Sequence, residues 1–187
     1  MAEQSLEELY QEEAVRLYAW ARLNIRAQHR HRLSAEDIAQ ETWFRAADRF
    51  STFDPTTRPF RAWIFSIAKN VLAEAMRQVH RRGRVRLDEG RTTLALEREQ
   101  AAHSSSGVAT RLARDEAVRA FLDRIERADL LDRQIFVLHV LEGHTIPEVA
   151  ERLQLGAEAT SKRWQRWRQR LRALGPPPEL LPKSGEQ

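Results

Sequence analysis

Apolar residues recur at spacings of three and four along most of the chain, which is the period of an amphipathic helix. Ser5-Leu6-Glu7-Glu8 has the pattern of a capping box and predicts a first helix of about twenty residues. Ser34, followed by two acidic residues, predicts the start of a second helix. The polar stretch Gln28–Arg32 predicts a turn, and Phe50–Arg58, with Asp54-Pro55, predicts a loop.

The most regular apolar stripe begins after Pro59 and predicts a third helix. Its members are Phe60, Trp63, Ile64, Ile67, Ala68, Val71, Leu72, Ala75, Met76 and Val79. Basic residues fall on another face at multiples of four, namely Arg61, Lys69, Arg77 and Arg81. The pattern therefore predicts a helix that buries one side, offers a basic side and ends at Arg82, before Gly83.

No sustained period is visible over residues 84–107, where Ser104-Ser105-Ser106-Gly107 has the composition of a linker. Helical patterning resumes over Val108–Ala128 and again from about Asp132 to Leu141. We therefore expect an all-α fold of two small helical domains joined by a flexible linker. The expected boundaries are 1–83 for the first domain, 84–110 for the linker, 111–175 for the second domain and 176–187 for a mobile tail.

The second domain has the pattern of a helix-turn-helix. Thr145-Ile146-Pro147-Glu148 is another capping box, with proline tolerated in the first turn. Gln154-Leu155-Gly156 predicts a turn, and a longer helix starts near Ala157. Two helices joined by so short a turn, with the small Ala150 at the tight contact, are typical of this motif.

The distribution of charge along the chain bears on function. The net charge is +4, but residues 49–86 carry nine Lys and Arg against two Asp and Glu. Residues 157–175 carry six basic residues against one acid. Two separated basic blocks favour a polyanion such as nucleic acid. Two solvated helix faces are the alternative; a membrane surface is less favoured, because each apolar stripe is needed for its own core.

Trp164 and Trp167 on the last helix allow two interpretations. Tryptophan can stack on bases, but these two share a seam with Leu171 and Leu174 at spacings of three and four. That spacing favours a role in the core, whereas the arginines of the same helix lie off the seam, where they could reach phosphates and base edges.

Several classes of function are disfavoured by what the sequence lacks. There is no cysteine, which excludes disulfides, thiolate zinc sites and cysteine catalysis. There is no signal peptide and no apolar run of membrane-spanning length, so we expect a cytoplasmic protein without a membrane partner. No glycine-rich phosphate loop, paired carboxylate motif or histidine metal spacing occurs, so we expect no enzyme, cofactor or metal site.

Three motifs in order resemble the extracytoplasmic-function (ECF) class of sigma factors. Residues 37–46, Asp-Ile-Ala-Gln-Glu-Thr-Trp-Phe-Arg-Ala, resemble the family's D-L-V-Q-E-T-F-L-R-A. Arg58–Asn70 resembles its F-x-x-W-L-x-x-I-A-R-N signature. Leu141-Glu142-Gly143, followed by Thr145–Leu171, aligns without gaps to its C-terminal helix-turn-helix. The resemblance covers nearly the whole chain except the linker and the tail.

The resemblance implies a division of labour between the domains. The first would be sigma region 2, a helical bundle that binds the clamp of core RNA polymerase and recognises and melts the promoter −10 element. The second would be sigma region 4, which binds the polymerase flap and reads the −35 element with its last helix. The implied partners are core RNA polymerase and promoter DNA, both double-stranded and melted. Many members of this class are also held by an anti-sigma factor.

The resemblance also implies site residues. For binding core polymerase they are Asp37, Gln40, Glu41 and Phe44. The alternatives are that Asp37 only serves the helix N-terminus and that Phe44 belongs to the core. For the −10 DNA they are Phe53, Asp54, Arg61, Lys69, Asn70 and Arg77. Asn70 offers the donor and acceptor that base recognition needs, although a surface asparagine is the default interpretation without the motif. Trp63 is expected in the core rather than as a wedge.

For the −35 DNA the implied residues are Thr160, Ser161, Lys162, Arg163, Arg166 and Arg170. The sequence departs from the family pattern at Ala128–Arg133, at Gln154, which replaces a common glycine, at Glu158 and Ser161, and at Ala73-Glu74-Ala75. An acid at the start of the recognition helix opposes the approach of phosphate. The departures at Glu158 and Ser161 motivate an alternative, a sigma-derived regulator that binds polymerase or DNA without initiating transcription.

Overall fold

A computed structural model describes residues 5–85 and 115–180, and within these ranges every regular element is a helix. The all-α prediction is therefore confirmed. The N-terminal unit consists of α1 (Leu6–Asn24), α2 (Ala35–Arg49) and α3 (Phe60–Val85), with short 3₁₀ turns at Ala27–His29 and Phe50–Thr52. The C-terminal unit consists of α5 (Glu116–Glu126), α6 (Leu130–Ile135), a π-helical segment (Phe136–Leu141), α7 (Ile146–Arg152), α8 (Ala157–Ala173) and a 3₁₀ turn (Pro178–Leu180).

The predicted caps start the helices where the sequence places them. In the capping box of α1, the Ser5 hydroxyl accepts from the Glu8 N–H, and the Glu8 carboxylate accepts from the Ser5 N–H at 3.0 Å. The Ser34 hydroxyl accepts from the Asp37 N–H at 3.0 Å at the start of α2. These bonds satisfy amide groups that have no partner within the helix. Behind them, Leu17, Ile64 and Thr42 are fully buried where the three helices meet.

Two predicted boundaries were wrong. Helix α3 does not end at Arg82 but continues through Gly83 to Val85, because one glycine costs a long helix only about 1 kcal/mol. The helix expected over Asp132–Leu141 begins earlier, at Leu130, after Asp129 caps it, and its second half is π-helical. Of the patterning expected over Val108–Ala128, α5 covers Glu116–Glu126, and residues 108–114 lie outside the described residues.

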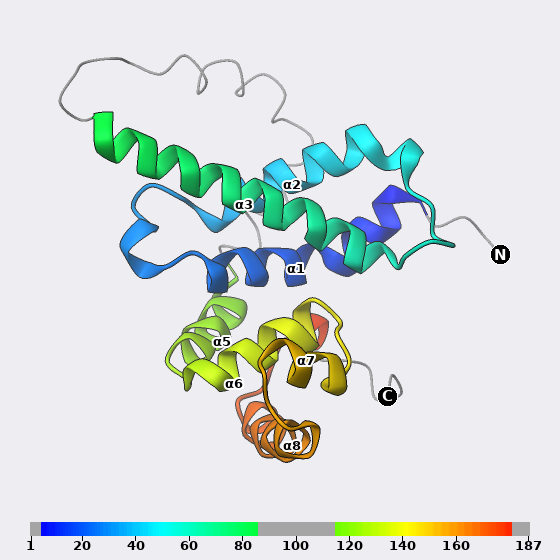
Figure 1. Ribbon diagram of the computed structural model, residues 1–187, viewed down its shortest axis with the longest axis vertical. Coiled ribbons are helices and arrows are strands. Elements are labelled where there is room, and N and C mark those ends of the chain that lie inside the picture. Colours follow the sequence, from blue (N-terminus) through cyan, green and yellow to red (C-terminus); the bar gives the residue numbers. More distant parts are fainter. Residues whose placement is uncertain (1–4, 86–114, 181–187) are drawn as a thin grey trace.

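The two units pack against each other, with the C-terminal unit lying along α1 (Figure 1). One cluster of buried apolar side chains contains residues of both units, among them Trp20 and Phe65 of the first and Phe121 and Phe136 of the second. Helix α8 lies at the far end from α1 (Figure 1). The part of the predicted linker beyond Val85, up to residue 110, lies outside the described residues.

The start of the predicted tail is packed rather than mobile. Pro177 is buried, and Leu180, which is 0% exposed, lies in the 3₁₀ turn that packs against α1. The apolar contact explains the difference, since Leu180 finds a partner surface that belongs to the other unit and is invisible in the local sequence. None of the helices in the described ranges is both long and apolar enough to cross a membrane.

Candidate nucleic-acid and protein interfaces

The residues predicted to bind core polymerase share the outward face of α2. Asp37, Gln40, Glu41 and Phe44 follow one another at helical spacing, opposite the buried Ile38, Thr42 and Ala46. Phe44 is 51% exposed, which excludes the alternative that it belongs to the core. The carboxylate of Asp37 is also exposed, in the first turn of the helix. The face therefore combines an exposed aromatic ring with acids and an amide, a surface suited to an arginine-rich partner.

An arginine bridge joins this helix to α3. Arg45 binds Glu41 on its own helix, with Nε 2.9 Å from Oε1, and Glu74 on α3, with Nη2 2.8 Å from Oε2. The hydrogen bond from Arg45 holds the pKa of Glu74 below its ordinary value. Glu74, one of the departures from the family pattern, therefore supports the packing of α2 on α3.

The loop before α3 is fixed by aromatic packing. The half-buried ring of Phe53 lies 5.0 Å from that of Trp63 and 5.4 Å from that of Phe60, measured between centroids. Trp63 is 4% exposed, so the prediction that it belongs to the core is confirmed. Phe53 thus presents only part of its ring at the surface.

Asp54 caps the turn that follows. Its Oδ1 accepts from the Thr56 hydroxyl at 2.7 Å and from the Thr56 N–H at 2.8 Å. These bonds, above all the one from the Thr56 hydroxyl, hold the pKa of Asp54 below its ordinary value. The carboxylate is therefore ionised at neutral pH. An exposed carboxylate next to the basic helix repels phosphate, so this position suits contact with a base edge better than contact with the backbone.

On α3 the structure separates the predicted DNA residues into two groups. Lys69, Asn70 and Arg77 are exposed on its polar side. Arg61 is half-buried, and its Nη2 lies 2.8 Å from Oε1 of Glu13, a carboxylate of α1 that is 5% exposed. The charge of Arg61 is therefore largely balanced inside the protein.

Helices α7 and α8 form the predicted helix-turn-helix. Thr145 and Glu148 make the capping box of α7, and Gln154 turns the chain with a φ of 55°. Trp164 and Trp167 are each 5% exposed, which confirms that they belong to the core. Thr160 is 1% exposed and its hydroxyl donates to the Gly156 carbonyl at 3.0 Å. Its side chain therefore does not lie on the outer surface of the helix, where the sequence analysis expected it.

An acidic clamp on α6 holds two arginines of α8. Asp132 is 3% exposed, and its Oδ1 and Oδ2 accept from Arg163 Nε at 2.6 Å and from Arg170 Nη2 at 3.0 Å. Asp129 also pairs with Arg163. The guanidinium of Arg170 lies 5.0 Å from the centre of the Trp167 ring. Both aspartates fall in the stretch that departs from the family pattern, so the departure supplies carboxylates that orient α8.

The rest of the predicted −35 surface is more open. Ser161 is half-buried. Lys162 is exposed and pairs with the equally exposed Glu158 one turn earlier, at 2.6 Å, and Arg166 is exposed as well. Glu158 thus partly offsets the charge of Lys162, whereas Arg166 lies on the side of α8 that no described element covers.

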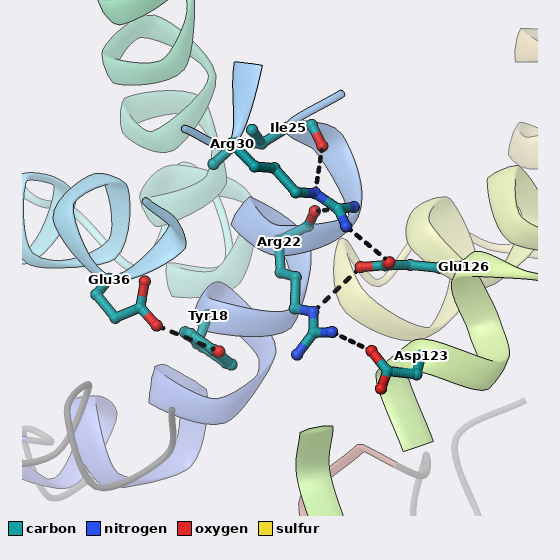
Figure 2. A network of polar contacts seen from close by, with 7 residues as sticks. All are labelled: Tyr18, Arg22, Ile25, Arg30, Glu36, Asp123 and Glu126. Carbon is teal, nitrogen blue, oxygen red and sulfur yellow. Dashed lines mark hydrogen bonds and ion pairs between the residues drawn. The ribbon is translucent and has the colours of Figure 1, made fainter. Parts of the chain in front are cut away.

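Sequence reasoning missed the residues between the two units. Arg22 of α1 pairs with Asp123 and Glu126 of α5, and Arg30 pairs with Glu126 at 2.8 Å (Figure 2). Glu142, just after the π-helical segment, accepts from Trp20 Nε1 at 2.8 Å and from Lys69 Nζ at 2.6 Å. No local pattern marks these pairs, because their members are between 73 and 122 residues apart. Only Glu142 could have been singled out from the sequence, because it lies in the family motif Leu141-Glu142-Gly143.

The surfaces described above differ in the kinds of side chain that they expose. In the ranges that the structure describes, no group of three or more His, Cys, Asp or Glu side chains could hold a metal ion. What the arrangement offers is an exposed aromatic and acidic face on α2, a basic and amide side on α3, and a helix-turn-helix with basic groups on α8.

Comparison with known proteins agrees with these features. Residues 9–82 match the family described as Sigma-70 region 2. The chain is 33% identical over 145 residues to the RNA polymerase sigma factor CnrH of Cupriavidus metallidurans, a match that spans 74% of this chain and 72% of CnrH. The chain therefore belongs to the ECF class of the sigma-70 family, as the three motifs suggested.

Two further relatives match over shorter stretches. The ECF RNA polymerase sigma factor BldN of Streptomyces coelicolor is 30% identical over 63% of this chain, which spans 41% of BldN. The ECF RNA polymerase sigma factor SigL of Mycobacterium tuberculosis is 35% identical over 52% of this chain, which spans 46% of SigL. Among solved structures, CnrH in complex with the cytosolic domain of CnrY matches with a TM-score of 0.38 and 26% identity, covering 90% of this chain and 86% of that one.

Proposed function

We propose that this protein is a sigma factor that binds core RNA polymerase, recognises a promoter and directs the initiation of transcription. The observation that carries the proposal is the half-exposed ring of Phe44 on the polar face of α2, in a unit whose next helix exposes Lys69, Asn70 and Arg77. One surface fits a protein partner and the other fits DNA, and a factor that brings polymerase to a promoter needs both.

Within this proposal, residues 1–83 act as sigma region 2. Lys69 and Arg77 contact phosphates of the −10 element, and Asn70 recognises a base through its amide. Phe53 and Asp54 form the neighbouring wall of the base pocket, since the loop that holds them is fixed against Trp63. Arg61 has a weaker part in DNA binding than expected, because Glu13 already balances its charge.

Residues 111–175 act as sigma region 4 and bind the −35 element through α8. Arg166 and Lys162 are the groups best placed to reach DNA, with Ser161 beside them. Arg163 and Arg170 are paired with Asp132, so they orient α8. The N–H groups that Asp132 does not accept from can contact phosphates. Because each phosphate contact releases counterions, binding is expected to weaken steeply as salt rises.

The test is reconstituted transcription. The purified protein is mixed with core RNA polymerase and promoter fragments, and runoff transcripts with mapped start sites are sought. Asn70→Ala is expected to lose promoter opening while still binding core polymerase, because it removes a base contact and leaves α2 unchanged. Gln78→Ala, an exposed amide on the same helix, is the matched control and should behave as the unaltered protein does.

The outcomes separate the proposal from its alternative. Co-elution with core polymerase but no transcript from any fragment would sink the initiation role and favour a regulator that binds polymerase or DNA without initiating transcription. The exposed Glu158 at the start of α8 is the observation that favours this alternative. Full promoter opening by the Asn70→Ala protein would overturn the assignment of the base contact.

The proposal includes no catalytic reaction and no cofactor, and it places the protein in the cytoplasm with the polymerase it serves. An anti-sigma factor that masks the binding surfaces is also part of it, as the family resemblance implies. Capture of a protein partner that blocks transcription in the reconstituted assay would support that part.

A further inference from the structure

Positive charge is also concentrated at the end of the N-terminal unit where α1 joins α2. The connection between these helices, residues 26–32, contains three arginines and two histidines and no acid. The last turns of α3, residues 75–85, contain four arginines and again no acid. Of these seven arginines, only Arg77 belongs to the predicted DNA residues, so most of this charge has no role in the surfaces described above.

The connection is a compact turn that is anchored at both ends. Ile25, which is 2% exposed, and the half-buried Leu33 pack into the apolar cluster on either side of it. Between these anchors the Arg32 N–H and the Leu33 N–H both donate to the His29 carbonyl at 2.9 Å. The backbone therefore has a defined course, and its polar side chains are held outside the core.

The three arginines of this turn have different surroundings. Arg30 folds back on the protein, with Nε 3.3 Å from the Ile25 carbonyl oxygen and Nη1 2.8 Å from Oε2 of Glu126 (Figure 2). Arg26 and Arg32 are exposed, and neither forms an ion pair with a carboxylate in the ranges that the structure describes. Arg30 thus fastens the turn, whereas Arg26 and Arg32 keep their charge for an external partner.

The turn lies beside the last part of α3, at the same end of the N-terminal unit (Figure 1). The rings of His29 and His80 join the two segments, with 5.7 Å between their centroids. Arg77 and Arg81 are one helical turn apart on either side of His80, and both are exposed. We use the name loop patch for the four exposed arginines of the two segments, which are Arg26, Arg32, Arg77 and Arg81.

We propose that the loop patch binds the phosphate backbone of double-stranded DNA next to the −10 element, on the side of the −35 element. The proposal rests on the function proposed above. Guanidinium groups bind phosphates through charge-assisted hydrogen bonds and without regard to base sequence. Four of them with no acid in either segment match a polyanion.

The length of α3 determines which phosphates are reached. Arg81 lies eleven residues beyond Asn70, or about 16 Å at the rise of an α-helix. Each base pair of DNA occupies about 3.4 Å along its axis, so the patch lies about five base pairs from the base assigned to Asn70.

Double-stranded DNA is the form that fits this position. In the proposed function the melted strand lies against Asn70 and the loop before α3, whereas the C-terminal unit reads the −35 element as a duplex. DNA that runs from one element to the other therefore passes the end of α3 while it is still paired. A duplex also carries one negative charge per roughly 1.7 Å, twice the density of a single strand.

The first test measures how tightly the protein, in complex with core polymerase, binds a fluorescent promoter fork as salt is varied. The fork has a single-stranded −10 element and either no duplex or about ten base pairs of duplex, one helical turn, on the −35 side. Arg26→Gln combined with Arg32→Gln should lower the slope of log affinity against log salt by about two for the fork with duplex. Its affinity at low salt should fall about tenfold or more, and binding of the fork without duplex should not change.

The matched control removes the same charge elsewhere. Arg49→Gln combined with Arg127→Gln alters two exposed arginines outside the loop patch, and should leave the affinity for both forks and the salt slope as in the unaltered protein. An equal effect of the two double variants would mean that net charge, and not the loop patch, determines binding, which would overturn the proposal.

The second test locates the DNA and uses the absence of cysteine from the chain. Gln28→Cys, at an exposed position of the turn, carries an iron chelate that cleaves DNA in its vicinity. Both strands should be cut about five base pairs from the base assigned to Asn70, toward the −35 element. Gln11→Cys, exposed near the start of α1, is the control and should not cut at that position.

Three results would contradict the proposal. They are an unchanged salt slope in the Arg26→Gln, Arg32→Gln protein, no cleavage of the duplex by the Gln28→Cys protein, and weaker binding of core polymerase with unchanged binding of DNA. The last would assign the loop patch to a protein contact. Failure of the proposed function is a separate result, seen as no complex with core polymerase. Both tests are then made on the protein alone, and the same slope and cleavage decide whether the loop patch binds duplex DNA.

Discussion

At the scale of single residues, the structure gives the departures from the family pattern a physical meaning. Glu74 pairs with Arg45 across α2 and α3, and Asp132 holds Arg163 and Arg170. Both are contacts between helices inside the protein. A departure in a binding motif therefore need not change what the surface binds.

Gln154 is a departure that costs stability. Its φ of 55° lies in the left-handed region, where a side chain with a Cβ is strained. We expect Gln154→Gly to raise the free energy of unfolding by about 0.5–1 kcal/mol, which is the strain relieved less the extra freedom that glycine gives the unfolded chain. The midpoint of thermal unfolding, measured by circular dichroism, should rise by roughly 1–4 °C.

Glycine is expected to lower the free energy of unfolding where the backbone is helical. Gln165→Gly, at an exposed position in α8, should lower the free energy of unfolding by about 1 kcal/mol. If both substitutions destabilise to the same extent, strain at Gln154 is not the explanation.

At the scale of elements, α2 and α3 each bury one side in the core and expose a polar side. Helix α2 buries Ile38, Thr42 and Trp43 and exposes Phe44. The apolar stripe determines that the helix packs, and the residues between its members are free to determine what it binds.

Phe44→Ala tests the outward face of α2. The ring is 51% exposed, so its loss should leave the midpoint of thermal unfolding within about 1 °C of that of the unaltered protein. Affinity for core polymerase should fall about 30-fold, because an aromatic at the centre of an interface commonly contributes about 2 kcal/mol. Competition binding to core polymerase measures it.

Arg49→Ala, exposed at the end of the same helix, is the comparison and should bind core polymerase with little change. If the Phe44→Ala protein binds core polymerase as tightly as the unaltered protein does, Phe44 is not part of the polymerase interface. A large fall in its thermal midpoint would show that the ring supports the fold instead.

At the scale of the whole molecule, the two units that the structure describes share one cluster of buried apolar side chains. Leu180 can be used to test how much the contact between the units stabilises the protein. It follows α8, the last helix of the second unit, and lies in a turn that packs against α1. Leu180→Ala should lower the free energy of unfolding by about 2–5 kcal/mol, the usual cost of truncating a fully buried leucine.

Leu130→Ala is the matched control, because Leu130 is 67% exposed and its truncation should cost less than about 0.5 kcal/mol. Denaturant unfolding followed by tryptophan fluorescence compares the two. Equal stability of both variants would mean that residues after α8 do not contribute to the shared cluster.

The sequence by itself determined the local and periodic features. Capping residues at Ser5, Ser34 and Thr145 and the apolar stripes gave most of the helices, since both signals act within one or two turns. Its three motifs gave the family. It also placed Trp63, Trp164 and Trp167 in the core, because their spacing follows the buried stripe.

The tertiary structure alone decided which predicted residues are free to bind and which are already engaged. Lys69, Arg61 and Arg163 are alike in sequence as exposed-face cations, but each pairs with a carboxylate from a different part of the chain. Such pairs join positions from 31 to 73 residues apart, and no local pattern records them. Charge can be counted along a chain, but its compensation depends on distance in space, and that is set only when the helices pack.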